Sequence, residues 1–135
     1  MRLFGDSSAW LAFFDRHQPE HAIVRRALGM LSRHSLMIYV TDYVVDETVT
    51  LILARAGHSN AVACGEWLLR SAFVQVVRIE PVQWDQSWAM FRRYDDKKYS
   101  FTDCTSFVVM QQYKLVDAFT FDRHFEQMGF RMWPA

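Results

Sequence analysis

Four acidic residues lie where the sequence predicts that the chain passes from a strand to a helix: Asp6, Glu47, Asp103 and Asp122. In open parallel sheets, loops and helix N-termini converge beyond the carboxyl ends of the strands, so we expect Asp6, Glu47 and Asp122 to lie there, while Asp103 begins a helix that leads back into the fourth predicted strand. Carboxylates gathered within ~5 Å would repel one another by roughly 3 kcal/mol per pair at an effective dielectric of ~20. Raised pKa values or hard divalent cations would offset this repulsion. The pattern therefore favours a metal site with oxygen ligands.

Three of these acids also have a purely structural interpretation. Asp6 and Asp122 each precede a predicted helix, where aspartate is a common N-cap. Asp103 stands three residues after Ser100, in a segment that approximates a capping box. Taken one at a time, these residues leave capping and metal binding open as alternatives.

Glu47 is harder to explain as a structural residue. At helical spacing its neighbours are apolar, and so is the opposite side of the same helix. The two stripes are Tyr43, Val44, Leu51 and Ala54, and Val45, Val49, Ile52 and Ala56. We therefore expect this helix to be enclosed, where an unpaired carboxylate would be costly. Glu47 then requires a cation, a proton or a water-lined cleft.

The elements that must position these acids alternate between strands and helices. Short β-compatible runs predict strands at Arg2 to Gly5, Leu36 to Val40, Phe73 to Ile79, Ala118 to Phe121 and Arg131 to Trp133. Such alternation implies an α/β fold with a mostly parallel central sheet covered by helices on both faces.

Helix start and stop signals fill the intervals. One helix is predicted to begin at Pro19 and to run to Arg33-His34, with an apolar stripe of Ile23, Ala27, Met30 and Leu31. Thr41 or Asp42 can cap the next, which Gly57 ends. Further helices are predicted from Ser59 to Ser71 and from Pro81 onward.

The helix that begins at Pro81 carries three rings, Trp84, Trp88 and Phe91, spaced three or four residues apart. A helix must bury one apolar face to be stable, so we interpret this stripe as core packing and assign it no cofactor role.

Composition bounds the remaining possibilities. A chain of 135 residues that is 51% hydrophobic fits one compact domain, residues 1–135. Fifteen basic residues balance fifteen acidic ones, which makes RNA binding by charge alone a weak hypothesis. Cys64 and Cys104 lie in no paired motif, so we expect two small core residues. With no apolar run near the ~20 residues of a membrane span, we expect a soluble, cytoplasmic protein.

Several segments together resemble a known family. The run Thr120-Phe121-Asp122-Arg123-His124-Phe125 is similar to the C-terminal signature of VapC-type toxins, which are PIN-domain ribonucleases. Phe101-Thr102-Asp103-Cys104 resembles their central motif, and Asp6-Ser7-Ser8-Ala9 and Glu47 match in order and spacing. One departure is Gly5, which stands where the family more often has an aliphatic residue.

The resemblance implies a three-layer α/β/α PIN fold and a Mg²⁺- or Mn²⁺-dependent endoribonuclease. Asp6, Glu47, Asp103 and Asp122 would bind one or two cations, which orient a water for in-line attack on phosphate. Ser7 and Thr120 would hold these acids by hydrogen bonds. For Arg123 and His124, contact with substrate phosphate and an exposed helix start remain alternatives, and we leave both residues out of catalysis. The resemblance further implies an antitoxin partner and a homodimer.

Other functional classes fit less well. A haloacid-dehalogenase-like phosphatase needs a second aspartate two residues after the first, where this chain has Ser8. A receiver domain needs adjacent acids after the first strand. Asp6 argues less strongly against a DNA-cleaving metal nuclease. The main alternative is a catalytically silent PIN-like module that binds a protein partner.

Overall fold

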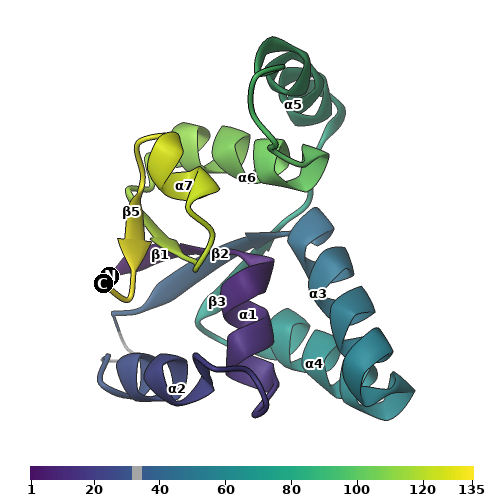
Figure 1. Cartoon of the computed structure of the whole chain (residues 1–135), viewed down its shortest axis with the longest axis vertical. Coiled ribbons are helices and arrows are strands. Elements are labelled where there is room, and N and C mark those ends of the chain that lie inside the picture. The colour runs from purple at the N-terminus through teal and green to yellow at the C-terminus, as the bar shows by residue number, and fades with distance from the viewer. Residues whose placement is uncertain (32–34) are drawn as a thin grey trace.

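A five-stranded parallel sheet forms the centre of the computed structural model, which describes residues 1–31 and 35–135 (Figure 1). The strands are β1 (Arg2–Gly5), β2 (Met37–Thr41), β3 (Val74–Val77), β4 (Asp117–Phe119) and β5 (Arg131–Trp133). Their order across the sheet is β3-β2-β1-β4-β5, and every pairing is parallel. The first strand, β1, therefore lies at the centre, between β2 and β4.

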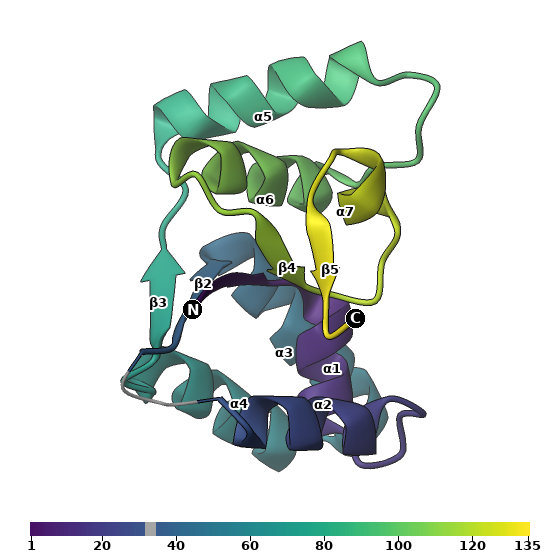
Figure 2. The same ribbon diagram turned by 90° about the vertical axis from the view of Figure 1, so that its left-hand side faces the viewer.

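Helices cover both faces of this sheet (Figures 1 and 2). On one face lie α1 (Ser7–Phe14), α2 (His21–Gly29), α3 (Asp42–Ala56) and α4 (His58–Arg70). On the other lie α5 (Pro81–Arg93), α6 (Phe101–Gln112) and α7 (His124–Gln127). The predicted three-layer α/β/α arrangement with a parallel sheet is confirmed.

All five predicted strands are present: β1 and β5 match the prediction at both ends, and the ends of the other three differ by one or two residues. β2 extends to Thr41, whose hydroxyl also accepts a hydrogen bond from the Val44 N–H and so caps α3. β4 begins at Asp117 and ends at Phe119, because Thr120 starts a turn in which its Oγ1 accepts the Asp122 N–H. Asp6, which follows β1, and Asp122, which follows β4, therefore lie near each other beyond the same edge of the sheet.

The predicted helix after Pro19 is present but shorter, and its buried face is different. α2 begins at His21 and ends at Gly29, and its buried side chains are Val24 and Leu28. Ile23 and Met30 are exposed, so the apolar residues that indicated this helix are not the ones that form its buried face. The predicted end at Arg33-His34 lies outside the described residues.

The interpretation of α3 as an enclosed helix is also wrong. Thr41 caps this helix and Gly57 follows its last turn with a φ of 87°, as the sequence predicts. However, its buried residues are only Val44, Thr48 and Ile52, while Glu47 is half-buried. Glu47 thus lies at the edge of the buried face and not in an apolar interior.

The aromatic stripe on α5 is not core, contrary to prediction. α5 packs on the outer side of α6, away from the sheet (Figure 2). Trp84, Trp88 and Phe91 are 41%, 46% and 40% exposed, and Ser87 is the buried residue of this helix. The three rings contact one another and Phe101 at the start of α6. We refer to Trp84, Trp88 and Phe91 as the aromatic stripe.

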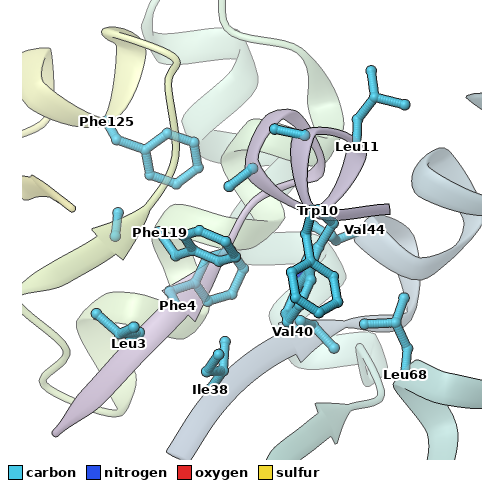
Figure 3. Packing of buried hydrophobic residues seen from close by; sticks show 14 of the residues in the cluster. Leu3, Phe4, Trp10, Leu11, Ile38, Val40, Val44, Leu68, Phe119 and Phe125 are labelled. Atoms are coloured by element: carbon cyan, nitrogen blue, oxygen red, sulfur yellow. The ribbon is translucent and has the colours of Figure 1, made fainter. Parts of the chain in front are cut away.

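The core lies between the sheet and its helices, and Trp10 of α1 is its largest fully buried side chain (Figure 3). A Cβ on Gly5 would lie 2.4 Å from the Trp10 Nε1 atom, so this indole requires glycine at the end of β1. The departure at Gly5 is thus explained by Trp10. Cys64 and Cys104 are buried free thiols, as predicted.

Candidate active site and metal centre

Asp6 directly follows the central strand β1, and its carboxylate does not cap the helix that comes next. Although Asp6 occupies the N-cap position of α1, no N–H of that helix bonds to its side chain. Its Oδ2 instead accepts hydrogen bonds from the hydroxyls of Ser8 (2.8 Å) and Thr120 (2.9 Å). With 4% exposure, this carboxylate is held in a fixed, buried orientation beyond the sheet.

Ser8 and Thr120 also connect the two central loops of the site. Their hydroxyl oxygens lie 3.2 Å apart, and the Ser8 hydroxyl accepts the backbone N–H of Phe121 at 3.0 Å. The loop after β1 and the loop after β4 are therefore joined by side-chain hydrogen bonds. Thr120 was predicted as a supporting residue, whereas Ser8 was not, although its position beside Asp6 was visible in the sequence.

Glu47 reaches the site from α3. Its Oε1 accepts a hydrogen bond from the hydroxyl of Ser7, the first residue of α1. This bond places Glu47 next to the loop that carries Asp6, and it shows Ser7 in contact with one of the acids that it was expected to hold.

Asp103 belongs to the first turn of α6, where the predicted capping box is present. The Ser100 hydroxyl accepts the Asp103 N–H at 2.9 Å, and Asp103 Oδ2 accepts the Ser100 N–H at 3.1 Å. The same Oδ2 lies 3.2 Å from His124 Nδ1. Capping thus occupies one oxygen of Asp103 and does not exclude a second role for the other.

Asp122, in the loop after β4, and His124, the first residue of α7, face Asp103. Asp122 Oδ1 accepts the backbone N–H of His124 at 2.9 Å and lies 3.4 Å from His124 Nδ1. In the described part of the chain, Asp103, Asp122 and His124 form the one group whose candidate ligand atoms all lie within 4.8 Å of one another. The alternative that His124 is only an exposed helix start is wrong, because its side chain is 28% exposed and faces two acids.

The electrostatics show that the acids share one environment. Burial, together with the nearby charges of Asp103 and Asp122, raises the pKa of Asp6 from 3.8 to about 6, although Ser8 and Thr120 oppose the shift. Burial also raises the pKa of Asp103, with a further contribution from Asp122. Asp6, Asp103 and Asp122 are therefore close enough to repel one another, while Glu47 joins them through Ser7.

The donor set fits a hard divalent cation. It consists of carboxylate oxygens with hydroxyl and amide groups behind them, which is the chemistry that Mg²⁺ and Mn²⁺ select. A cation would restore the charged form of carboxylates whose pKa values are raised by burial and mutual repulsion.

Comparison with known proteins agrees with the fold. The PIN domain family matches residues 3–131. Mycobacterium tuberculosis VapC20, a 23S rRNA-specific endonuclease, is 34% identical over 131 residues, which is 95% of each chain. Ribonuclease VapC26 of the same species is 28% identical over 124 residues, 91% of this chain and 89% of that one.

Solved structures show the same relationship. The crystal structure of VapC20, described as a sarcin-ricin loop cleaving toxin, superposes with a TM-score of 0.87 at 32% identity, covering 95% of both chains. FitAcB from Neisseria gonorrhoeae has a TM-score of 0.68 at 16% identity, covering 98% of this chain and 96% of that one, and shares the fold. The chain therefore belongs to the PIN domain family. Within it, the chain is a VapC-type toxin ribonuclease, an endoribonuclease that cleaves phosphodiester bonds.

Proposed function

We propose that Asp6, Glu47, Asp103 and Asp122 are the metal-binding residues of this endoribonuclease, and that Mg²⁺ or Mn²⁺ is its cofactor. The observation that carries the proposal is the buried Asp6 carboxylate, which lies within electrostatic reach of Asp103 and Asp122 and has a raised pKa. A protein gains nothing in stability from gathering unpaired acids, so the cost points to a ligand.

The chain's own residues then have distinct tasks in hydrolysis. Asp6 and Asp103, each held by two donors, present fixed oxygens to a cation. Glu47 and Asp122 supply the remaining negative charge, and each would bind the cation either directly or through a water molecule. A bound divalent cation supplies Lewis acidity and lowers the pKa of water. Ser7, Ser8 and Thr120 hold the carboxylates and donate no nucleophile.

Cleavage of RNA by variants tests the assignment. We expect metal-dependent cutting by the wild-type protein with Mg²⁺ or Mn²⁺ and none with EDTA. Asp6→Asn and Asp103→Asn should abolish cutting, because each keeps the size of the side chain and removes a ligand charge. Asp46→Asn, an exposed acid beside Glu47 on α3, is the matched control and should cut normally. Full activity in Asp6→Asn or Asp103→Asn would refute the site.

For the target, we propose a structured ribosomal RNA. This proposal rests on VapC20, whose name states 23S rRNA specificity and which shares 34% identity with this chain. Cleavage of purified 23S rRNA should yield one dominant cut, whereas a mixed messenger RNA pool should stay intact. A cytoplasmic location fits such a target. If no RNA is cut under any metal, the silent protein-binding module becomes the better interpretation.

We also propose an antitoxin partner, on the family resemblance, and a homodimer. The surface that supports a dimer is the aromatic stripe, since subunit interfaces bury aromatic side chains of this kind. Trp88→Glu should halve the mass measured by light scattering. Val82→Glu, at another exposed apolar position of α5, is the control and should leave the mass unchanged. A monomeric wild-type protein at high concentration would exclude the dimer.

A further inference from the structure

His124 places one ring nitrogen between two of the proposed metal-binding acids. Its Nδ1 lies 3.2 Å from Asp103 Oδ2 and 3.4 Å from Asp122 Oδ1. Its neighbour Arg123 behaves differently, with a side chain that is 78% exposed and paired with Glu126. Arg123 and His124 are adjacent at the start of α7, but the first side chain points to solvent and the second faces the acids.

The packing of α7 determines which of the two side chains turns inward. Phe125 is fully buried; its ring stacks on Phe4, with centroids 6.3 Å apart, and contacts Phe107 edge-on, with centroids 5.0 Å apart. The ring of Tyr99 contacts the imidazole edge-on at 5.2 Å. Together with the Asp122 Oδ1 bond to the His124 N–H, these contacts fix the orientation of the imidazole.

The chemistry of the two neighbours specifies the role of Nδ1. Both facing atoms are carboxylate oxygens, which only accept hydrogen bonds, so the nitrogen between them donates a proton. Asp103 Oδ2 then receives two donors, His124 and the Ser100 N–H. Oδ1 of Asp103 stays available for a cation. Orienting donors of this kind commonly change metal affinity by about 10- to 100-fold.

We propose that His124 is a positioning residue of the metal centre, whose Nδ1–H donates to Asp103 and holds this carboxylate beside Asp122 in the arrangement that binds the cation. The proposal rests on the metal site proposed above. His124 itself does not bind the cation, so its loss weakens Mg²⁺ and Mn²⁺ binding by the same factor. A ligating imidazole would behave differently, because nitrogen ligands favour Mn²⁺ over Mg²⁺.

Calorimetry with Mg²⁺ and Mn²⁺ on the full chain, without RNA, tests this role. His124→Phe keeps a ring against Tyr99 but has no donor, and we expect its affinity for both ions to fall about tenfold or more. His124→Asn has an amide that can donate from about the same position, and should recover most of the affinity. Arg123→Gln is the matched control and should bind both ions as the wild type does. Thermal melting verifies that each variant is folded.

Three outcomes would overturn the proposal. Unchanged affinity in His124→Phe would show that the donor has no role. A loss confined to Mn²⁺, or a direct Mn–nitrogen coupling detected by electron spin-echo spectroscopy of the wild type, would make His124 a ligand. If the wild type binds neither ion, the metal centre itself fails, and this inference fails with it. If the wild type binds metal and His124→Phe binds it equally well, only the role proposed for His124 fails, and the metal centre stands.

Discussion

At the scale of single residues, the site is built from acids that are held mainly by neutral donors. The hydroxyls of Ser7, Ser8 and Thr120 hold Glu47 and Asp6, and the Ser100 amide holds Asp103. Among the described residues, none of the four acids forms an ion pair with lysine or arginine. Hydroxyls and amides orient a carboxylate without cancelling its charge. The negative charge therefore remains for a cation to offset.

The raised pKa of Asp6 predicts how stability depends on pH when metal is removed. The folded protein holds this proton up to about pH 6, whereas the unfolded chain releases it near 3.8. The contribution of Asp6 to the free energy of unfolding is therefore complete below pH 4 and is lost as the pH rises to about 6. The loss amounts to about 3 kcal/mol.

Asp6→Asn lacks this ionisation and supplies the comparison. In EDTA, the stability of Asp6→Asn relative to wild type should rise between pH 4 and pH 7 by up to about 3 kcal/mol. Urea unfolding of both proteins at several pH values measures the difference. A constant or falling difference across this range would show that Asp6 is not a buried, destabilising carboxylate.

At the scale of elements, the sequence predicts what local chemistry determines. The cap at Thr41, the end at Gly57, the start at Pro81 and the capping box from Ser100 to Asp103 are all present. Each depends on a few consecutive residues. The burial of a helix face depends instead on which other element covers it.

Two mistaken expectations follow from this limit. Periodicity showed that α5 has an aromatic stripe, but not that α6, on which α5 packs, leaves the stripe exposed (Figure 2). Likewise, the sequence gives no sign that His124 turns inward, because that depends on α7 packing against distant residues. By contrast, Asp6 and Asp122 were expected to lie together because they follow strands at the carboxyl edge of a parallel sheet, and the adjacent positions of β1 and β4 do not depend on such detail.

The contrast between two tryptophans tests this account of the elements. Trp10 is fully buried and contacts Phe119 edge-on with ring centroids 5.2 Å apart, so Trp10→Ala should cost about 3 to 5 kcal/mol. Trp88 is 46% exposed, so Trp88→Ala should cost no more than about 1 kcal/mol. Chemical unfolding at concentrations where the chain is monomeric measures both. Equal costs would contradict the outward placement of the aromatic stripe.

At the scale of the whole molecule, the site exists only in the folded chain. Asp6 and Asp122 come from opposite ends of the sequence and meet because β1 and β4 are adjacent at the centre of the sheet. Glu47 and Asp103 arrive from helices on opposite faces of the sheet (Figure 1). Local peptides would not reproduce this arrangement. The proposed cation binding would therefore be linked to global stability, because an ion that binds the folded state and not the unfolded chain stabilises the fold.

This linkage predicts that Mn²⁺ raises the melting temperature of the wild-type protein. At about 100 times the dissociation constant, binding adds about 2.7 kcal/mol, which for a domain of this size is a shift on the order of 10 °C. EDTA should reverse the shift. Asp103→Asn should lose most of it, because that variant removes a ligand charge, while the exposed Asp46→Asn control should keep it. A shift of equal size in all three proteins would mean that Mn²⁺ binds elsewhere on the molecule, and the four acids would then need another explanation for being held together.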